Sequence, residues 1–247
     1  MISACILAKN SQRSIAATLA SLSRLNEVIL LDTGSTDQTL AIARTFPNVV
    51  VHQVVFSRFG LLRNQAALMA KNNWILAIDS DEVLSTPLQN EILSLALDQN
   101  AVYEINFHNY YNGKRIVGCG WHPEKHIRLY NRRSNRFSDS LIHEGVLING
   151  LQVKRLTHSI LHTPYGSISD FLLKMQLYSD LFAQENRGLR SSSFAKALAH
   201  ASAAFFKSYV LKYGILMGKE GAIISFYNAN MAFYKYLKLT EANQNIP

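Results

Sequence analysis

The chain has 247 residues, of which 48% are hydrophobic, and carries a formal net charge of +8 at pH 7. A chain of this size can bury one large core, or one domain with a small appendage. Its twelve glycines and five prolines form no low-complexity run, so long disorder is not expected. The two cysteines, Cys5 and Cys119, have neither metal-ligand spacing nor a disulfide framework, which indicates a reducing compartment.

The positive charge calls for an anionic partner, namely a nucleic acid, an anionic lipid surface or a phosphorylated substrate. The sequence contains neither zinc-finger spacing nor an aromatic and glycine-rich RNA-binding signature, so we expect no nucleic acid. No stretch reaches the roughly 18 consecutive apolar residues of a spanning helix, and the first residues lack a signal-peptide pattern. We therefore expect a cytoplasmic protein that can still attach to a membrane face.

Strands and helices alternate in the first part of the chain. Apolar runs predict buried strands over residues 2–8, 28–31 and 49–55. Between them, Ser11 is the expected N-cap of a helix with apolar residues three to four apart, and a second helix covers residues 40–46. This β-α-β-α-β pattern with short connections is typical of a parallel, doubly wound nucleotide-binding half.

Two polar residues of this half are candidates for ligand binding. Asp32 closes the second strand, where ribose or base recognition often falls; the alternative is a turn residue that caps the next helix. Arg63 lies in the first turn of a helix that begins at Phe59, where the helix dipole disfavours a cation. A basic residue there indicates an anionic ligand nearby, with an ordinary exposed arginine as the alternative.

The strongest chemical signal is the stretch from Trp74 to Glu82, an apolar run that stops at three carboxylates. In an open α/β sheet, ligands bind beyond the carboxyl ends of the strands. Asp79-Ser80-Asp81 therefore places hard oxygen ligands where a divalent cation and a phosphate could meet. The alternative is a helix N-cap or a solvated turn. A helix over residues 88–97, capped at Thr86, is expected to close this half near residue 100.

The second half is expected to be β-rich and antiparallel. Strands are predicted over residues 102–110, 127–130, 141–148 and 152–162, with Asn-Gly turn signals at residues 112–113 and 149–150. Seven Lys and Arg against one Glu lie between residues 112 and 136, which favours an anionic acceptor site over a solvated basic hairpin.

From residue 167 onward the chain is predicted to be helical. Ser167 and Asp170 resemble a capping box, and two more helices cover residues 193–213 and 221–239. These helices carry aromatic residues on more than one side with lysines between them, which suits an interfacial helix on a membrane. The alternatives are an internal bundle or a dimer interface, and a homo-oligomer is one of the expected partners.

Several motifs together resemble those of a known family. They are Lys9-Asn10 after the first strand, residues 32–37 (Asp-Thr-Gly-Ser-Thr-Asp), Phe59-Gly60-x-x-Arg63-Asn64, residues 79–82 (Asp-Ser-Asp-Glu), Ile142-His143-Glu144, Tyr209-x-x-x-x-Gly214 and Gly218-x-x-Gly221. Their order and spacing resemble an inverting glycosyltransferase of family 2. More narrowly, the chain resembles the bacterial lipopolysaccharide or lipooligosaccharide inner-core β-1,4-glucosyltransferases. Two departures are Ser11, where many relatives carry Glu, and Arg63, where many carry Lys.

The resemblance implies an α/β chain with the GT-A fold, a Rossmann-like, mostly parallel sheet flanked by helices. Residues 1–166 would form the catalytic domain, with a nucleotide-sugar-binding half (1–100) and an acceptor half (101–166). Residues 167–247 would form a helical extension that associates with a membrane or with a second subunit. The implied location is the cytoplasmic face of the inner membrane, whose anionic surface would be a partner.

The implied reaction moves glucose from UDP-glucose onto a heptose of the inner core, with Mg²⁺ or Mn²⁺ as cofactor. Asp81 is expected to bind the metal directly. Asp79 is expected nearer the ribose or in the outer coordination shell of the metal, and His162 is a further metal or phosphate contact. The residues expected to line the nucleotide-sugar pocket are Ala8, Asn10, Asp32, Arg63, Asp79 and Ser80.

An inverting displacement needs a base opposite the leaving group, so the Asp-x-Asp pair cannot supply it. By resemblance Glu144 is the expected catalytic base, with Asp139 in reserve, and His143, Arg128 and Trp121 are the expected acceptor contacts. Two rival hypotheses are a nucleotidyltransferase and a non-enzymatic basic protein that binds membranes or nucleic acid. The first lacks a glycine-rich loop near residue 8, and the second leaves the carboxylates unexplained.

Overall fold

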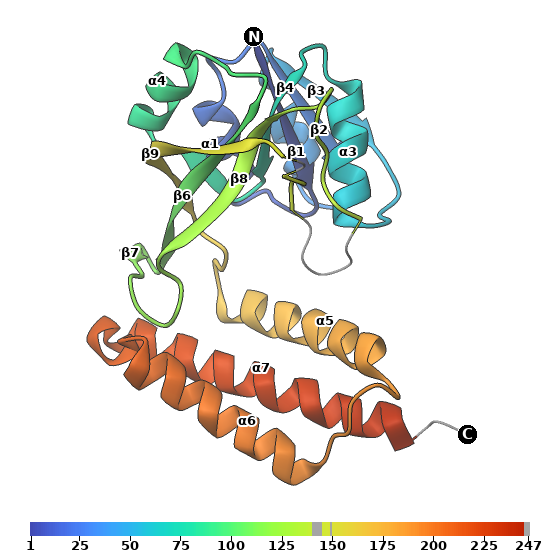
Figure 1. The fold of residues 1–247 in the computed structure, drawn as a ribbon, viewed down its shortest axis with the longest axis vertical. Coiled ribbons are helices and arrows are strands. Elements are labelled where there is room, and N and C mark those ends of the chain that lie inside the picture. The colour runs from blue at the N-terminus through green and yellow to red at the C-terminus, as the bar shows by residue number, and fades with distance from the viewer. Residues whose placement is uncertain (140–144, 149, 245–247) are drawn as a thin grey trace. The chain divides into compact units, whose positions relative to one another are not determined.

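The computed structural model describes residues 1–139, 145–148 and 150–244, and the chain divides into two compact units (Figure 1). The first unit comprises Met1–His108 and Glu124–His162, and the second comprises Asn109–Pro123 with the chain from Thr163 onward. Each unit is described by itself.

The first unit is built on a mixed sheet with the strand order β3-β2-β1-β4-β8-β6-β9-β5. Its strands are β1 (Ile2–Ala8), β2 (Glu27–Asp32), β3 (Val49–Gln53), β4 (Trp74–Asp79), β5 (Glu82–Leu84), β6 (Ala101–Tyr111), β8 (Glu124–Asn131) and β9 (Gln152–His162). Its helices are α1 (Ile15–Ser21), α2 (Thr39–Ala43), α3 (Phe59–Met69) and α4 (Thr86–Ser94).

The register of the sheet explains where its polar edge lies. Strands β1 to β4 pair in parallel, with Ala8 opposite Asp32 and Leu7 opposite Asp79. The carboxyl ends of three strands therefore meet at one edge. The strands beyond β4 pair antiparallel, as the sequence predicts for the second half.

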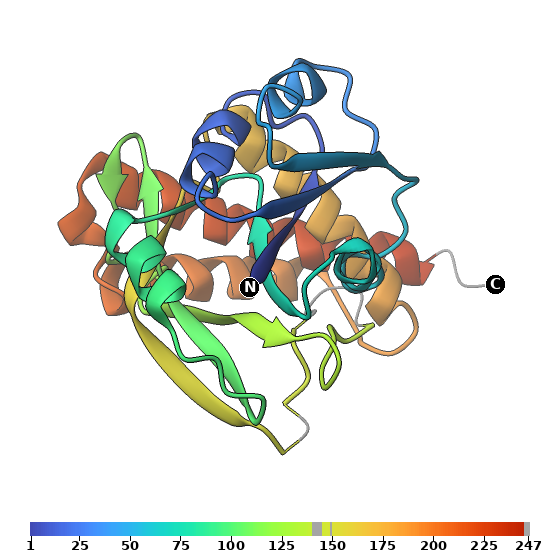
Figure 2. The same ribbon diagram turned by 90° about the horizontal axis from the view of Figure 1, so that it is seen from above.

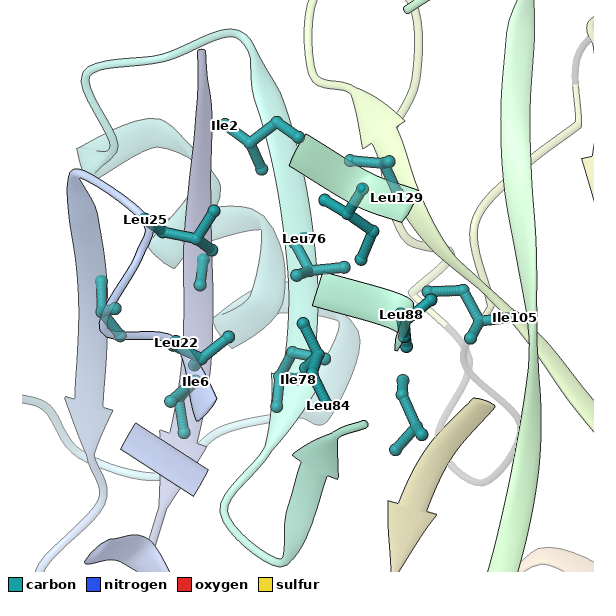
Figure 3. Close-up of a cluster of buried hydrophobic side chains, with 14 of the residues drawn as sticks. Ile2, Ile6, Leu22, Leu25, Leu76, Ile78, Leu84, Leu88, Ile105 and Leu129 are labelled. Atoms are coloured by element: carbon teal, nitrogen blue, oxygen red, sulfur yellow. The ribbon is translucent and has the colours of Figure 1, made fainter. Parts of the chain in front are cut away.

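Helices cover both faces of the parallel strands. Successive side chains of β1 point to opposite faces, so its apolar residues pack against helices on both sides. On one face Ile6 packs with α1, and this hydrophobic cluster continues into the antiparallel half through Leu76 and Leu129 (Figure 3). On the other face Cys5 packs with Ala66 and Ala67 of α3. Figures 1 and 2 show α1 and α3 on opposite sides of β1. This is the doubly wound arrangement expected from the sequence.

Two predicted helix starts are wrong by a few residues. Ser11 does not cap α1, whose N-cap is Ser14, because Ser11 opens a preceding turn in which its carbonyl accepts from the Ser14 and Ile15 N–H groups. For α4 the N-cap is Ser85 rather than Thr86, since the Ser85 hydroxyl accepts from the backbone N–H of the third helical residue.

The strand predicted over residues 141–148 lies partly outside the described residues. Within the described part, Val146 forms an isolated antiparallel bridge with Phe137.

The second unit contains three long helices, α5 (Ile168–Asn186), α6 (Phe194–Phe206) and α7 (Lys219–Gln244), and α7 packs against the other two. The predicted cap of α5 is confirmed, since the Ser167 hydroxyl accepts from the Asp170 N–H at 3.3 Å. A π-helical turn (Lys207–Leu211) and a 3-10 turn (Gly214–Met217) join α6 to α7, and β7 (Lys114–Arg115) pairs with the end of β6. Among the described residues, no helix is both long and apolar enough to span a bilayer.

Two glycines that contribute to the family resemblance allow a close contact in this unit. A Cβ atom on Gly221 would lie 1.8 Å from the carbonyl oxygen of Gly214, and one on Gly214 would lie 2.8 Å from the Ser208 carbonyl oxygen. These carbonyl oxygens belong to the backbone, so they cannot move aside as the end of a flexible side chain would. The start of α7 and the 3-10 turn can therefore approach this closely only because both positions are glycine.

We expect Gly221→Ala to lower the free energy of unfolding of the second unit by about 3 kcal/mol, because its methyl group overlaps the Gly214 carbonyl. Urea denaturation of the full chain, followed by circular dichroism, measures the change. Gly145→Ala is the matched control, since a Cβ atom there meets nothing within 4 Å. Equal midpoints for the two variants would contradict the close contact.

Candidate active site

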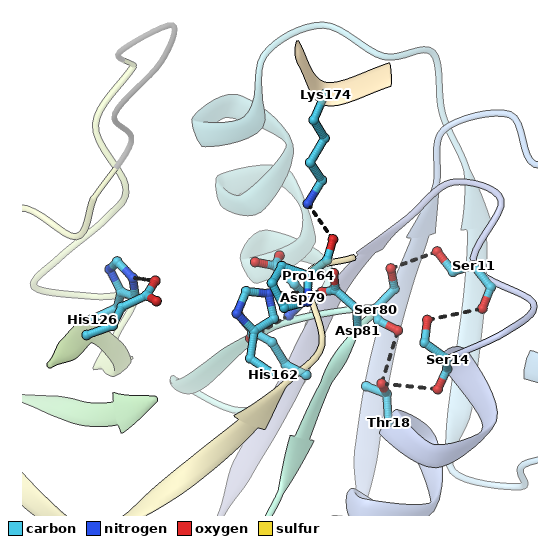
Figure 4. Close-up of polar contacts among 12 residues, drawn as sticks. Ser11, Ser14, Thr18, Asp79, Ser80, Asp81, His126, His162, Pro164 and Lys174 are labelled. Atoms are coloured by element: carbon cyan, nitrogen blue, oxygen red, sulfur yellow. Dashed lines mark hydrogen bonds and ion pairs between the residues drawn. The ribbon is translucent and has the colours of Figure 1, made fainter. Parts of the chain in front are cut away.

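The polar edge of the parallel sheet gathers most of the residues predicted to bind a nucleotide sugar. Ala8 and Asp32 end adjacent paired strands, and Asp79 ends β4 on the other side of β1. Asn10 and Ser80 follow Ala8 and Asp79 in the chain, so they lie in the loops that leave this edge. Figure 4 shows Asp79, Ser80 and Asp81 beside Ser11 at this edge.

Asp32 organises the loop that follows β2. Its carboxylate is fully buried and accepts from the backbone N–H groups of Gly34 and Ser35, each at 3.1 Å. Asn10 closes the same loop from the β1 side: its side-chain oxygen accepts from the Thr36 N–H at 2.8 Å. Asp32 therefore holds a turn, as the alternative states, but it does not cap the next helix, because the N-cap of α2 is Gln38. A nucleotide contact of Asp32 stays a prediction.

Ser80 is fixed from two sides. Its hydroxyl lies 2.7 Å from that of Ser11, and its carbonyl oxygen accepts from the Thr18 hydroxyl at 3.1 Å (Figure 4). Ser11, one of the two departures from the family pattern, therefore holds the turn between the two aspartates.

Two buried arginines engage the carboxylate of Asp79. Arg63 donates to one oxygen at 2.7 Å and Arg128 donates to the other at 3.0 Å. Burial alone would raise the pKa of Asp79, but the two guanidinium charges overcome it and hold that pKa far below its usual range. The position of Arg63 predicts an anionic group nearby, and Asp79 of the same chain is such a group.

Arg128 also pairs with Glu82, the third carboxylate of the stretch. Glu82 is fully buried, and its other oxygen accepts from the Asp79 backbone N–H at 2.8 Å. Burial, opposed by Arg128 and reinforced by the Asp79 charge, raises the pKa of Glu82 to about 7. The sequence patterns give Glu82 no role of its own and place Arg128 among the acceptor contacts. The sequence feature that could have indicated the Arg128–Glu82 pair is Glu82 itself, a carboxylate at the start of an apolar strand.

Asp81 and His162 come together although 80 positions separate them in the chain. Strands β5 and β9 pair with Glu82 opposite His162, so the last residue of β9 lies beside the Asp-x-Asp turn. The Nε2 atom of His162 is 3.7 Å from Oδ1 of Asp81. Burial alone would lower the pKa of His162, but the adjacent Asp81 carboxylate and the charges of Glu82 and Asp79 overcome this and raise it.

The donor set of Asp81 and His162 suits a divalent cation. A carboxylate and an imidazole side by side fit Mn²⁺, while Mg²⁺ prefers oxygen ligands alone. The described residues contain no preformed group of three metal-ligating side chains, so a bound substrate and water would complete the coordination. Both carboxylate oxygens of Asp79 already accept hydrogen bonds from arginines, which favours a position for Asp79 in the outer coordination shell rather than as a direct metal ligand.

The remaining predicted residues are not brought to this edge by any described contact. His143 and Glu144 lie outside the described residues, and the reserve base Asp139 is exposed. Trp121 belongs to the second unit, where its ring stacks on Tyr165 with centroids 5.7 Å apart.

We expect Arg128→Met to lower the free energy of unfolding by about 3–5 kcal/mol, because it leaves Glu82 buried without its cation. Denaturant unfolding of the full chain measures this. Arg155→Met is the matched control: Arg155 pairs with Glu104 at the surface, and its loss should cost less than about 1 kcal/mol. Adding Glu82→Gln to Arg128→Met should recover part of the loss. Equal stabilities of the two single variants would contradict a structural role for Arg128.

The first unit has the architecture of the GT-A class: a mixed sheet flanked by helices, with an Asp-x-Asp turn at the carboxyl end of a central parallel strand. Residues 3–146, more than half of the chain, match the family model described as Glycosyl transferase family 2, and the chain belongs to this family. Family membership sets aside the nucleotidyltransferase and non-enzymatic alternatives.

Full-length relatives agree with this assignment. The chain is 28% identical over 259 residues to an uncharacterized glycosyltransferase of Rickettsia conorii, covering 99% of this chain and 90% of that one. It is 25% identical over 257 residues to the lipopolysaccharide core biosynthesis glycosyltransferase LpsC of Rhizobium meliloti, covering 95% and 93%. Among solved structures, it is similar to S. aureus TarS with a TM-score of 0.47 and 15% identity, covering 99% of this chain and 92% of that one.

Proposed function

We propose that the chain transfers glucose from UDP-glucose, with inversion, to a heptose of the lipopolysaccharide or lipooligosaccharide inner core, at the cytoplasmic face of the inner membrane. The observation that carries the proposal is the meeting of Asp81 and His162 at the carboxyl ends of the parallel strands. The acceptor is supported by the name of the LpsC relative and by the motif resemblance over almost the whole chain.

The donor would lie along the polar edge. Ala8 and Asp32 end β1 and β2, and Asn10 lies in the loop after β1; we assign all three to the uracil and ribose. The Asp32 contacts keep that loop in one conformation, which lowers the entropy cost of binding. Ser80, fixed by Ser11 and Thr18, would keep the backbone between the two aspartates in place beside the donor.

The ion pairs of the site explain why a diphosphate would need an added cation there. Arg63 and Arg128 already contact Asp79 and Glu82, and His162 lies beside Asp81, so the cationic side chains at this edge each face a carboxylate of the same chain. A diphosphate would have to compete with these carboxylates. Asp81 and His162 would hold Mg²⁺ or Mn²⁺, and that cation would neutralise the leaving diphosphate.

The acceptor hydroxyl needs a base on the opposite side of the sugar from the diphosphate. We assign this role to Glu144, with Asp139 as the reserve, and keep His143 and Trp121 as acceptor contacts. Arg128 we now assign to Asp79 and Glu82 instead, because its guanidinium already contacts both carboxylates.

A donor screen tests the proposal. The full chain is incubated with one UDP-sugar at a time, Mn²⁺ or Mg²⁺, and a deacylated core oligosaccharide that contains heptose, and the product mass is measured. We expect a mass increase of one hexose with UDP-glucose and none when EDTA is present. Transfer of another sugar would correct the donor alone, and absence of product with every UDP-sugar would overturn the proposal.

A further inference from the structure

The segment that joins α6 to α7 lies at the end of the bundle away from the C-terminus (Figure 1). Between residues 206 and 216 six large apolar side chains are each 44–70% exposed. We call this set the apolar tip; its members are Phe206, Val210, Leu211, Tyr213, Ile215 and Leu216. Exposing six such side chains within eleven residues costs solubility and calls for a partner.

The backbone of the apolar tip is held rigidly. The Ser208 hydroxyl is buried, lies 2.9 Å from that of Ser225 and accepts from the Asn228 amide at 3.0 Å. The Lys212 carbonyl accepts from the Cys119 N–H at 2.7 Å, which ties the tip to the hairpin beside it. Tyr213 has a φ of 55°, in the left-handed region that non-glycine residues rarely adopt. The hydroxyl of Ser208 is therefore bonded inside the bundle, while the apolar side chains of the same segment are exposed.

Cations surround the apolar tip. Lys207, Lys212 and Lys219 are exposed, and residues 206–219 contain no acidic residue. Lys114, on the adjacent hairpin, donates to the Met217 carbonyl at 2.6 Å, and its neighbour Arg115 is exposed. The nearest acid, Glu220, is buried and lies within 3.9 Å of both Lys114 and Lys219. The rim is thus strongly positive.

The combination distinguishes between possible partners. Interfaces between protein subunits are depleted in lysine, whereas aliphatic and aromatic side chains ringed by lysines suit the boundary of an anionic bilayer. The lysine stems can lie along the apolar region while their ammonium groups reach lipid phosphates.

We propose that the apolar tip inserts into the surface of an anionic lipid bilayer. Insertion of the apolar tip does not require the transfer reaction; its use, to hold the enzyme where a lipid-anchored acceptor lies, rests on the proposed function. A test with lipid alone therefore fails or succeeds independently of the donor screen, which uses a soluble acceptor.

Vesicle sedimentation tests the proposal. The full chain is expected to sediment with phosphatidylglycerol-rich vesicles at low salt and to stay in solution with pure phosphatidylcholine. Ile215→Gln with Leu216→Gln should weaken binding at least about tenfold, because two apolar side chains lose their burial. Lys207→Gln with Lys212→Gln should weaken it roughly 30-fold, at about 1 kcal/mol for each lysine.

Matched controls come from the first unit. Leu68→Gln with Leu93→Gln, and Lys71→Gln with Lys125→Gln, remove the same kinds of exposed side chain and should leave binding unchanged. Equal binding by the Ile215/Leu216 variant and its control would overturn the proposal. So would a finding, by light scattering without lipid, that the Ile215/Leu216 variant turns a dimer into a monomer.

A reporter on the apolar tip separates insertion from loose adsorption. Cys5 and Cys119 are buried, and burial raises the pKa of Cys5 to about 12 and raises that of Cys119 as well, so neither should react in the folded chain. An environment-sensitive dye on Leu216→Cys should shift to the blue on phosphatidylglycerol-rich vesicles. The same dye on Leu68→Cys should not. No shift at residue 216 despite sedimentation would overturn insertion.

Discussion

Replacing Asp81 with alanine is expected to lower sugar transfer by about a thousandfold while the chain stays folded. Asp81 is the half-buried carboxylate that faces His162, and we assign it to the divalent cation. A lost cation contact withdraws several kcal/mol of charge stabilisation from the leaving diphosphate, and about 4 kcal/mol corresponds to a thousandfold in rate. The initial rate of transfer at saturating UDP-glucose and Mn²⁺ measures the change.

The control for Asp81→Ala is Asp98→Ala, which removes a carboxylate that pairs with Lys154 at the surface. Its transfer rate should stay within a factor of about two of the parent, because surface pairs contribute little. His162→Ala should raise the Mn²⁺ concentration needed for half-maximal rate. If Asp81→Ala kept more than a tenth of the parent rate, Asp81 would not be the metal ligand.

The second large effect is expected from Glu144→Gln, at about a thousandfold loss of transfer with saturating acceptor. Glutamine keeps the shape of the side chain but cannot take the proton of the attacking hydroxyl, and general-base catalysis contributes roughly 10²–10⁴-fold. UDP binding should be unchanged, because an inverting displacement requires the base to act on the side of the sugar opposite the diphosphate.

Asp139→Asn separates the two candidate bases. It should retain close to the parent rate if Glu144 is the base. Near-full transfer by Glu144→Gln combined with a large loss in Asp139→Asn would move the assignment to the reserve residue.

The positions of the residues that we propose for the donor site could be predicted because they depend on local patterns. The apolar runs that form β1, β2 and β4 are easily recognised in the sequence; β2 and β4 end at an aspartate, and β1 ends at Ala8, directly before Lys9 and Asn10. Parallel pairing then requires these ends to lie together, so Asp32 and Asp79 meet at the expected edge.

The electrostatic partners could not be predicted, since they depend on pairings between distant strands. Arg128 reaches Asp79 and Glu82 because β8 lies next to β4. His162 is an expected metal contact together with Asp81, but the β5–β9 pairing that brings the two side chains together has no sequence signal, because β5 is too short to be periodic. A charge in a sequence indicates that a partner exists but does not show which group that partner is.

The extent of the C-terminal unit was also beyond the sequence patterns. Residues 109–123 resemble an ordinary hairpin of the β-rich half, yet they group with the helices after residue 163. Their attachment depends on backbone contacts such as that between Cys119 and Lys212, for which no hydrophobic period gives a signal.

Binding of UDP by calorimetry, with and without Mn²⁺, tests the central claim most directly, because it needs no acceptor. For the parent chain we expect binding that depends on Mn²⁺ and is lost when EDTA is added. For Asp81→Ala we expect Mn²⁺ to bring no gain in UDP affinity. Equal UDP affinity with Mn²⁺ and with EDTA, in both the parent chain and Asp81→Ala, would contradict a metal-dependent donor site at the Asp81 edge.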